Sequence, residues 1–562
     1  MDHKDFDFII IGAGPAGCAL AAILARARTH PSVLLLEAGC ENTNLSLRID
    51  GERQFASANK AVDWGYSTVP QEHLGGRTFP YPRGKGLGGS SVVNYEAFTV
   101  GPKDDYDEWA ERVGDPDFSW KRMQTRFRRL ETYHGPPKAY QKYVNPHEHN
   151  HGQHGDLQVG FPPTWEKDLP ELLDIFEKIG VEMNDDINSG NPIGMGVSPN
   201  SAFNGTRSTA ADLLQNAPPN LVIKTDTPVT KVIFKDSTAL GVETEDKKSP
   251  DLASKDVILS AGAFDTPKIL MHSGIGPADE LQNHGIPVVH DLPFVGKNLR
   301  DHLGCFTLFK RANETSDRGE YFSNPSAIEA AKEQWLKDRT GPLSLFGCTM
   351  GMGFFKSDSI YSSKEFCELP KEQQRHLRQE TVPVWEAFSH LLFPQGRGLE
   401  PTQDYWALLI VLLNLQSTGE VRLQSSDPAV PLLYDFEYLS HPYDQRIAIE
   451  AGRAYMGLIN SSEFQNAIKE PFLAPKSESQ EDIMAFFKGM LNPVYHAMGT
   501  VKMGKKEDPE TCVDNTFSVQ GVKNLRVADM SIAPLLFNNH PQSTAYVTGM
   551  TLADKLIDEY KL

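Results

Sequence analysis

The sequence predicts an α/β fold, and three observations near its N-terminus support this prediction. The apolar run 8–11 is followed by a glycine-rich segment, residues 12–17, and then by an alanine-rich stretch with helical character, residues 18–28. A second apolar run, residues 33–36, ends at Glu37. Strand, glycine-rich turn, helix, strand and terminal acid in this order are typical of a Rossmann-like dinucleotide-binding unit.

Each residue type in this motif has a physical role. Gly12 permits the tight turn, Gly14 lets backbone N–H groups approach a pyrophosphate, and Gly17 lets the helix pack closely on the strand. The helix N-terminus stabilises the phosphate charge. Glu37 is placed to accept hydrogen bonds from ribose hydroxyls, and it would repel the 2′-phosphate of NADP. The motif alone does not distinguish FAD from NAD as the cofactor.

Composition narrows the class of protein. A length of 562 residues suggests two to four domains at roughly 150 residues each. The net charge of -19 at pH 7 argues against nucleic acid and anionic membrane surfaces as partners. The six cysteines form no CxxC pair, and the later apolar run 407–415 suits a buried strand rather than a membrane span. With no signal peptide visible, we expect a soluble cytoplasmic protein.

Residues 84–94 form a second glycine-rich segment. Its glycines, among them Gly88, and the hydroxyl groups of Ser90 and Ser91 allow the backbone to lie flat against a planar or phosphate-bearing ligand. Taken alone, the segment is equally compatible with an ordinary loop.

Residues 262–276 form a third segment that follows a strand-like apolar run, residues 257–259. The pattern predicts a short helix over residues 266–272 that is closed by Gly274. Pro267 then stands in the first turn, where a proline is tolerated.

Together the last two segments resemble the two signatures of the glucose–methanol–choline (GMC) oxidoreductases, flavoenzymes that oxidise alcohols. The resemblance extends from about residue 5 to about residue 558 and is weakest over residues 306–400. Further matching positions are 205–208, Val229, 295–302, 417–421 and 427–428.

The resemblance implies an α/β architecture in which a Rossmann-like FAD-binding domain is interleaved with a substrate-binding domain on a mainly antiparallel sheet. The FAD-binding domain would comprise residues 1–160, 200–305 and 490–562, and the substrate-binding domain residues 161–199 and 306–489. The implied FAD-binding residues are Gly12, Gly14, Gly17, Glu37, Gly88, Ser90, Ser91, Asn94, Val229, Asp529, Pro541 and Gln542. Val92 and Val93 stand where some members carry a flavin-attaching histidine, which implies non-covalent FAD.

The C-terminal segment is similar to the family's catalytic pattern, with His496 as the general base and His540 as its partner. Ala497 departs from the pattern, in which a proline is usual. An alcohol must lose its hydroxyl proton as hydride leaves for flavin N5, and imidazole titrates nearest to neutral pH. A second group orients the hydroxyl. A helix that begins at Pro541 would stabilise the negative charge of the reduced flavin through its N-terminus.

The weakly matched region predicts the nature of the substrate. The apolar runs 343–346, 354–355 and 391–393 are candidate wall material, so we expect a small or medium primary alcohol that is aromatic or otherwise apolar. Oxygen or another acceptor would take up the electrons, with oxygen favoured by what is usual in the family. Three alternatives stay open: a lyase or a light-driven decarboxylase on the same FAD scaffold, and a non-catalytic flavin-binding protein.

One histidine-rich stretch raises a competing hypothesis. His147, His149, His151 and His154, with Asp156, resemble a metal-binding cluster in spacing. The stretch is polar, is flanked by proline and glycine, and falls in a variable loop of the family. We therefore expect no metal site here.

Overall fold

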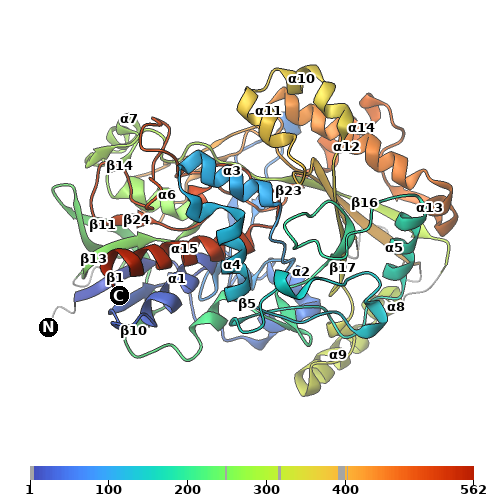
Figure 1. The fold of residues 1–562 in the computed structure, drawn as a ribbon, viewed down its shortest axis with the longest axis horizontal. Coiled ribbons are helices and arrows are strands. Elements are labelled where there is room, and N and C mark those ends of the chain that lie inside the picture. Colours follow the sequence, from blue (N-terminus) through green and yellow to red (C-terminus); the bar gives the residue numbers. More distant parts are fainter. Residues whose placement is uncertain (1–4, 247–249, 314–317, 390–398, 401–402) are drawn as a thin grey trace.

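Two seven-stranded β-sheets organise the chain, and a large cavity is lined by residues of both. The structure, a computed structural model, describes residues 5–246, 250–313, 318–389, 399–400 and 403–562 (Figure 1).

The first sheet has the strand order β10-β2-β1-β13-β12-β11, and β24 pairs with β13. Neighbours among β10, β2, β1, β13 and β24 run parallel, whereas β12 is antiparallel to both β11 and β13. The strands are β1 (Asp5–Ile11), β2 (Val33–Leu36), β10 (Leu221–Lys224), β11 (Val229–Lys235), β12 (Thr238–Thr244), β13 (Asp251–Leu259) and β24 (Leu525–Val527). Parallel strands covered on both faces require continuous apolar runs, which is why the two N-terminal runs predicted β1 and β2.

The N-terminal and C-terminal segments meet beside this sheet. Helices α1 (Pro15–Ala25) and α15 (Gln542–Tyr560) lie side by side (Figure 1). A Cβ atom on Gly549 would lie 2.1 Å from the carbonyl oxygen of Ala16, so only glycine permits this close approach. The nucleotide-binding unit is therefore completed by the last helix of the chain.

The second sheet has the order β22-β16-β19-β18-β17-β7, with β23 paired to β16, and every pairing in it is antiparallel. The strands are β7 (Gly194–Ser198), β16 (Leu303–Arg311), β17 (Met350–Phe355), β18 (Trp385–Ser389), β19 (Tyr405–Leu412), β22 (Ile468–Leu473) and β23 (Asn492–Pro493). This confirms the predicted fold class, and β19 confirms the buried strand expected near residues 407–415. The exact domain boundaries stay a prediction.

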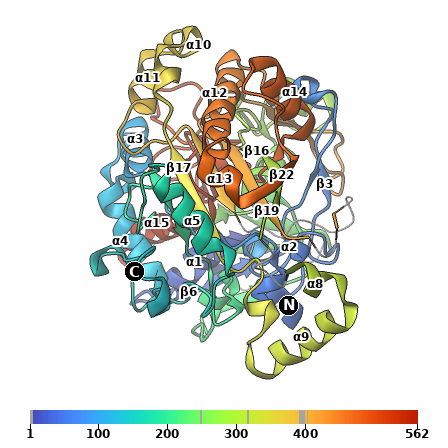
Figure 2. The same ribbon diagram turned by 90° about the vertical axis from the view of Figure 1, so that its right-hand side faces the viewer.

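Helices cover one face of the second sheet, and the cavity lies on the other. Figure 2 shows α5 (Asp168–Lys178), α12 (Pro442–Ile459) and α13 (Ser462–Ala467) in front of its strands. Thr307 on β16 hydrogen-bonds to Tyr455 of α12, whereas the preceding residue, Phe306, lines the cavity. Successive side chains of a strand point to opposite faces of the sheet, so Thr307 faces the helices and Phe306 faces the cavity.

Shorter elements connect these layers. The remaining helices are α2 (Arg53–Ala56), α3 (Lys103–Val113), α4 (Trp120–Leu130), α6 (Gly262–His272), α7 (Ala278–Asn283), α8 (Arg318–Ser323), α9 (Pro325–Asp338), α10 (Lys364–Cys367), α11 (Lys371–Leu377) and α14 (Gln480–Met490). Two-stranded pairs are formed by β3 (Tyr66–Ser67) with β4 (Pro80–Tyr81), β5 (Glu131–Tyr133) with β6 (Leu157–Val159), β8 (Ala202–Phe203) with β9 (Thr206–Arg207), β14 (Ile275–Gly276) with β15 (His290–Asp291), and β20 (Glu420–Arg422) with β21 (Leu433–Asp435). Among the described residues, no helix is long and apolar enough to cross a membrane.

Helix α6 begins four residues earlier than the sequence predicted, which corrects the position of Pro267. The proline lies inside the helix rather than in its first turn. It has no N–H to donate to the carbonyl group of Ala263, four residues before it. The hydroxyl of Thr500 donates to that carbonyl oxygen at 2.7 Å. A residue of the C-terminal segment thus satisfies the acceptor that the proline leaves free.

Candidate functional site

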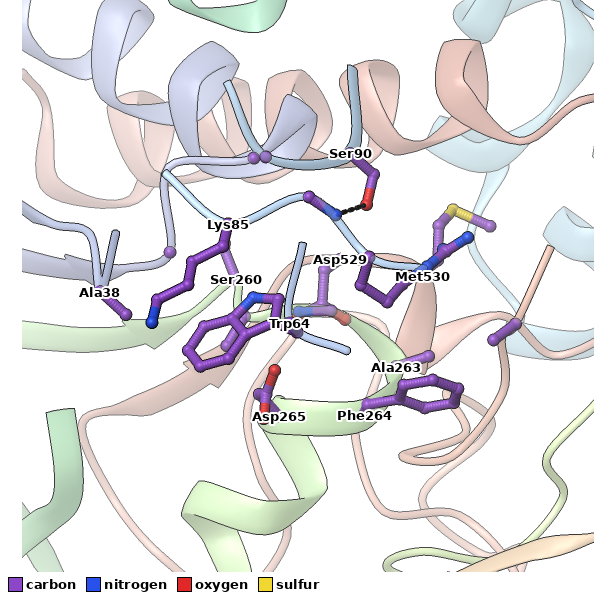
Figure 3. A pocket seen from close by; sticks show the side chains of 18 of the residues that line it. Ala38, Trp64, Lys85, Ser90, Ser260, Ala263, Phe264, Asp265, Asp529 and Met530 are labelled. Atoms are coloured by element: carbon purple, nitrogen blue, oxygen red, sulfur yellow. Dashed lines mark hydrogen bonds between the residues drawn. The ribbon is translucent and has the colours of Figure 1, made fainter. Parts of the chain in front are cut away.

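The predicted site residues gather around a cavity of about 1130 Å³. All of them line it except Gly17 and Gly88. Figure 3 shows part of the lining, with Trp64, Lys85 and Asp529 around the space. The cavity therefore joins the nucleotide-binding unit to the two histidines of the C-terminal segment.

The first glycine turn has the geometry that a diphosphate requires. Gly12 has φ of +100°, and a Cβ atom there would lie 2.5 Å from the carbonyl oxygen of Ser260. A Cβ atom on Gly17 would lie 2.0 Å from the carbonyl oxygen of Gly12, so α1 packs against the turn too closely for any side chain. A Cβ atom on Gly14 would meet nothing within 4 Å. The backbone at Gly14 is thus open to a ligand in the cavity.

Glu37 ties the two glycine-rich segments together. Its carboxylate accepts hydrogen bonds from the backbone N–H groups of Ala13, Gly39 and Gly86, each at 2.9 Å. The side chain also lines the cavity. Because a carboxylate has about four lone-pair sites, one remains for a ligand, and the ribose contact stays a prediction.

The second glycine segment packs directly on the first. The N–H of Gly88, which has φ of +98°, donates to the carbonyl oxygen of Ala13 at 2.9 Å. The hydroxyl of Ser91 donates to the carbonyl oxygen of Gly88 at 2.6 Å and accepts from the N–H of Ala210 at 2.9 Å. Ser90 accepts from the N–H of Gly84 at 3.2 Å (Figure 3). The two serines therefore shape the loop as well as lining the cavity.

The C-terminal segment closes the cofactor side of the cavity. Asp529 accepts hydrogen bonds from the N–H of Ser531, the N–H of Gly262 and the hydroxyl of Thr266, at 2.7, 2.9 and 2.6 Å. Helix α15 begins at Gln542, with Pro541 as its N-cap, one residue later than predicted. The N-terminus of this 19-residue helix lines the cavity and presents unpaired backbone N–H groups there. On the other side, Val229 begins β11 and also lines the cavity.

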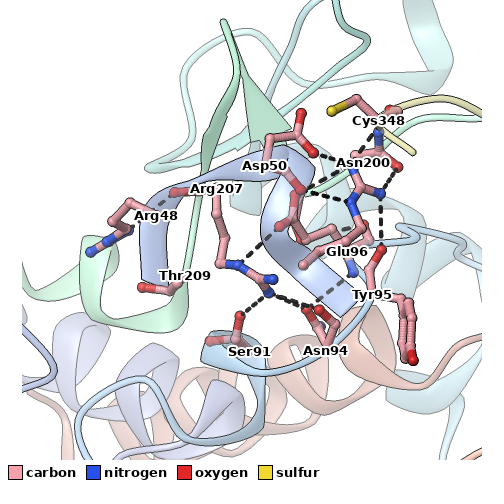
Figure 4. Close-up of polar contacts among 12 residues, drawn as sticks. Arg48, Asp50, Ser91, Asn94, Tyr95, Glu96, Asn200, Arg207, Thr209 and Cys348 are labelled. Carbon is pink, nitrogen blue, oxygen red and sulfur yellow. Dashed lines mark hydrogen bonds and ion pairs between the residues drawn. The ribbon is translucent and has the colours of Figure 1, made fainter. Parts of the chain in front are cut away.

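A buried charge cluster supports the second glycine segment, and one of its members, Glu96, also lines the cavity (Figure 4). Nε of Arg207 lies 2.9 Å from Oε1 of Glu96, and Arg53 pairs with both Asp50 and Glu96. Burial raises the pKa of Glu96 to about 8, although the two arginines oppose this shift. Arg207 also donates to Oδ1 of Asn94 at 2.9 Å.

This cluster reaches the N-terminus of α15 through one side chain. The amide of Asn94 donates to Oε1 of Gln542, and the Nε2 group of Gln542 is buried with no hydrogen-bond partner in the described part of the chain. Because its oxygen is taken by Asn94, Gln542 keeps its donor for another molecule. An unpaired buried donor beside a cavity is what a ligand-binding position requires.

The two predicted catalytic histidines lie together and bring in further residues. The rings of His496 and His540 are 4.8 Å apart, centroid to centroid, at 77°. Nδ1 of His496 lies 2.9 Å from Nδ1 of His302, which precedes β16. Nε2 of His540 lies 3.0 Å from Oε1 of Glu386 on β18. The segment before β16, strand β18 and the C-terminal segment thus contribute to this cluster.

Asp301 holds the two loops that carry these histidines. Its carboxylate accepts from the backbone N–H groups of His496 and His302 at 2.7 and 2.8 Å. The hydroxyls of Tyr81 and Tyr438 donate to it at 2.8 and 2.7 Å. The cluster is therefore fixed through its backbone as well as through its side chains.

The unusual Ala497 takes part in the same network. Its N–H donates to the hydroxyl oxygen of Tyr81 at 2.9 Å. A proline at this position has no N–H and could not make this hydrogen bond. The departure from the family pattern is thus matched by an extra contact that orients Tyr81 toward Asp301.

Burial sets the charge of the histidines. Burial, together with repulsion from the nearby His540, lowers the pKa of His302 to about 3. Burial also lowers the pKa of His496 well below its usual range, with added repulsion from His540, His302 and Arg83. His496 and His302 are therefore neutral at neutral pH, and a neutral imidazole can accept a proton.

The apolar wall beside the histidines differs from the predicted one. It is formed by Phe306 on β16, Leu409 on β19 and Phe388 on β18, which lie side by side in the sheet register, with Met350 on β17. The ring of Phe388 lies 5.8 Å from that of His540.

The runs 343–346 and 354–355 do not line the cavity, so that expectation was wrong. Leu343 and Phe346 pack with Trp335 in a separate core, and Phe354 lies in the core behind the wall. The run 391–393 lies outside the described residues. Short apolar runs look the same in sequence whether they face a core or a cavity.

The histidine-rich stretch does not converge on one point. His151 is buried between Glu131 and Asp186, at 3.0 and 3.3 Å, whereas His147, His149 and His154 are exposed. Among the residues that the structure describes, no group of three or more His, Cys, Asp or Glu side chains is arranged to hold a metal ion.

Sequence reasoning assigned no role to three residues of the histidine cluster. Asp301 and His302 end the segment 295–302 that carries the resemblance, but nothing in their neighbourhood indicated a contact with His496. Glu386 lies in the weakly matched region and has no motif around it. A Rossmann-like unit that shares a cavity with a histidine pair defines the class of dinucleotide-dependent oxidoreductases.

Comparison with known proteins narrows this class. Residues 6–304 and 416–549 match the N-terminal and C-terminal profiles of GMC oxidoreductases. The chain is 33% identical to an alcohol dehydrogenase [acceptor] of Pseudomonas putida, over 98% of this chain and 96% of the relative. It is 30% identical to an oxygen-dependent choline dehydrogenase of Brucella anthropi, over 98% and 95% of the two chains. A formate oxidase structure from Aspergillus oryzae RIB40 superposes with a TM-score of 0.89 at 26% identity and covers 100% of this chain and 99% of its own.

The chain therefore belongs to the GMC oxidoreductase family. It is an FAD-dependent oxidoreductase of the class that acts on CH–OH donors.

Proposed function

We propose that this chain oxidises a small or medium primary alcohol with an apolar, for example aromatic, substituent to the corresponding aldehyde. The single observation that carries this proposal is the juxtaposition, in one cavity, of the His496–His540 pair with the wall of Phe306, Phe388 and Leu409.

The residues present fit non-covalent FAD. The open backbone at Gly14, the unpaired donor of Gln542 and the free N–H groups at the start of α15 are features that a dinucleotide with a polar ring edge would satisfy. Bound FAD supplies the two-electron acceptor of the reaction. Val93 lines the cavity near these groups and has no side chain able to bond covalently to a flavin.

His496 is the proposed proton acceptor for the alcohol hydroxyl. Its Nδ1 is engaged with His302, which leaves Nε2 as the nitrogen available to the substrate. For Nε2 to accept, the shared proton must reside on Nδ1 of His496, which then donates to His302. Because the pKa of His302 is depressed to about 3, that imidazole stays neutral and available as an acceptor.

His540 is the proposed partner that orients the hydroxyl. A carboxylate only accepts hydrogen bonds, so the contact with Glu386 places a hydrogen on Nε2 of His540. This leaves Nδ1 for the substrate. Glu386 therefore acts as a positioning residue for His540 rather than as a group that touches the alcohol.

The apolar wall supports the proposed substrate class. A sugar would need several fixed polar partners, because each buried hydroxyl left unpaired costs about 1–3 kcal/mol. Phe306, Phe388 and Leu409 offer none. Glu386, whose carboxylate is bonded to His540, does not line the cavity and so offers no counter-charge to a quaternary ammonium group there.

Comparison of kcat/KM for benzyl-type alcohols, glucose and choline tests this proposal. We expect an aryl or allylic alcohol to reduce the flavin fastest, because burial of its apolar group against the wall stabilises the bound substrate. Faster reduction by glucose or choline than by every such alcohol would contradict the substrate class. Absence of flavin bleaching by any alcohol under anaerobic conditions would instead favour a lyase, a decarboxylase or a non-catalytic protein.

Acid precipitation tests the attachment of the cofactor. The purified protein should be yellow, and precipitation should release intact FAD into the supernatant. Flavin that stays with the pellet would contradict non-covalent binding.

A further inference from the structure

A second, small cavity lies next to the segment that carries Asp301 and His302. It has a volume of about 30 Å³ and is lined by Arg112 of α3, Arg300, His376 of α11, Asn414 and Gln416. This volume holds a water molecule or a monatomic ion, and it is too small for a cofactor or an organic substrate. Its polar lining includes two guanidinium groups, which only donate hydrogen bonds.

Most N–H donors of Arg300 at this cavity have no acceptor in the described chain. Its Nε group donates to Oδ1 of Asn298 at 3.1 Å. In the part of the chain that the structure describes, its Nη1 and Nη2 groups have no hydrogen-bond acceptor and no carboxylate within 4 Å. A guanidinium carries five N–H donors, so most of this charged group is unsatisfied by protein.

Arg112 adds a second positive charge to the same cavity. Its Nε group donates to Glu108 at 2.8 Å and its Nη1 group to the carbonyl oxygen of Pro534 at 3.1 Å, which leaves Nη2 free among the described residues. Burial, together with repulsion by Arg112, lowers the pKa of Arg300 to about 10. Two like charges thus face one small cavity.

The neighbouring carboxylates are already bonded elsewhere. Asp444 accepts from the backbone N–H groups of Gln416 and Ser417 and from the hydroxyl of Ser417. Glu108 is shared between Arg112 and Arg375. Within the described chain, no carboxylate pairs with both guanidinium groups.

His376 lines the same cavity. It is buried, and neither of its ring nitrogens makes a hydrogen bond within the described chain, although Nε2 lies 3.3 Å from Oδ1 of Asp105. Asp105 accepts instead from the backbone and amide of Asn538 at 2.7 and 3.0 Å. Nδ1 lies 4.0 Å from Oε2 of Glu108, so each ring nitrogen of this residue lies near a carboxylate.

We propose that Arg112 and Arg300 form a binding site for a monatomic anion, for which chloride is the physiological probe. An anion that accepts from both guanidinium groups would satisfy their free N–H donors and cancel their repulsion. It would also connect α3 to the segment that precedes β16.

The position of this site gives it a structural consequence for the histidine cluster. The backbone of Arg300 exchanges two hydrogen bonds with Met498, each of 3.0 Å, and Met498 lies two residues after His496. Asp301 and His302 follow Arg300 directly. An anion that immobilises Arg300 would therefore stiffen both loops that hold the histidines, without touching the substrate cavity.

Thermal unfolding of the holoprotein tests the proposal in solution. We expect sodium chloride to raise the melting temperature by a few degrees, in a saturable manner, relative to sodium gluconate at the same pH and ionic strength, because binding to the native state alone stabilises it. The difference should vanish in Arg300→Gln and Arg112→Gln. It should persist in Arg122→Gln, whose side chain is 65% exposed and lies 3.6 Å from Asp117. Equal melting in the two salts, or a difference that survives both cavity variants, would overturn the proposal.

Diffraction from wild-type crystals grown with sodium bromide keeps the proposal testable if the variants do not fold. An anomalous peak within hydrogen-bond distance of both guanidinium groups is expected. A water molecule at this position in such crystals would overturn the anion site and leave the proposed oxidation chemistry unaffected.

Discussion

Among the regions of this molecule that bury histidines, two shift the pKa of the ring in opposite directions. His151 stacks on Tyr133, with ring centroids 3.7 Å apart, and contacts Glu131 and Asp186 through its two nitrogens. Burial alone would lower the pKa of His151, but hydrogen bonds and attraction from the two carboxylates raise it to about 9. His302 and His496 are buried to a similar degree, and both have a lowered pKa.

The difference teaches that the partners of a buried histidine decide whether the effect of burial on its pKa is overcome. An imidazolium that donates through both nitrogens has no lone pair left for a substrate, so His151 serves the fold. A neutral imidazole bonded through one nitrogen keeps the other free, so His496 can serve chemistry. The following predictions test this contrast.

The largest expected effect is on flavin reduction. His496→Ala should lower the reduction rate by roughly 10²–10⁴, the usual contribution of a general base, and leave the FAD content nearly unchanged. His151→Ala should change the rate per folded, FAD-loaded enzyme little, because His151 lies outside the cavity lining. Stopped-flow measurement of both variants checks this, and a fast His496→Ala enzyme would remove the assignment.

The next effect is on stability. His151→Ala should lower the free energy of unfolding by about 3–5 kcal/mol, because it leaves Glu131 and Asp186 buried without their shared cation. His154→Ala, on an exposed neighbour, is the matched control and should change it by less than about 0.5 kcal/mol. Urea unfolding of the three proteins at pH 6 gives the comparison. Equal losses in both variants would show that His151 contributes no special pairing.

The stability difference should also depend on pH. The pKa of His151 is raised above its ordinary value of 6.5 to about 9, so its contribution is complete below pH 6.5 and is lost as pH rises from 6.5 to 9. The shift corresponds to about 3 kcal/mol. The gap between wild type and His151→Ala should therefore shrink by that amount from pH 6 to pH 9.5. A gap that stays constant would contradict the charged state of His151.

His302 gives the opposite pH dependence, since its pKa is depressed to about 3. Above pH 6.5, His302 is neutral in both the folded and the unfolded protein and does not change the free energy of unfolding. As pH falls from 6.5 toward 3, the unfolded state binds a proton that the folded state does not, so stability is lost.

The smallest expected effect concerns the positioning of His540. Glu386→Gln replaces a charge-assisted hydrogen bond by a neutral one and should lower kcat/KM by roughly 10-fold, or about 1.4 kcal/mol, which is close to the lower end of the roughly 1.5–3 kcal/mol of a bond to a charged group. It should also shift the pH profile of flavin reduction, which loss of packing alone would not do. Thr381→Ser, a conservative change at a buried residue that does not line the cavity, is a control for general perturbation of this region. An unchanged pH profile in Glu386→Gln would argue against a positioning role.

Local elements of the fold and the two catalytic candidates could be predicted from the sequence alone. The strands β1 and β2 and the turn at Gly12 and Gly14 follow from residues adjacent in the chain, because apolar runs and positive φ angles are local requirements. The pattern around residues 495–504 and 538–542 likewise led to His496 and His540, and the structure brings these two rings together. Boundaries were less secure, as the early start of α6 shows.

Only the tertiary structure decided how these pieces act together. His302 contacts His496 across 194 residues, and Glu386 contacts His540 across 154. The cavity wall is built on Phe306, Phe388 and Leu409 rather than on the runs that the sequence favoured. Such contacts join segments that lie far apart in the chain, and no local pattern records them, because the same residue types serve equally well as core. The charge of each buried histidine follows from these distant neighbours, since a pKa responds to whatever burial and charges the fold places around the ring.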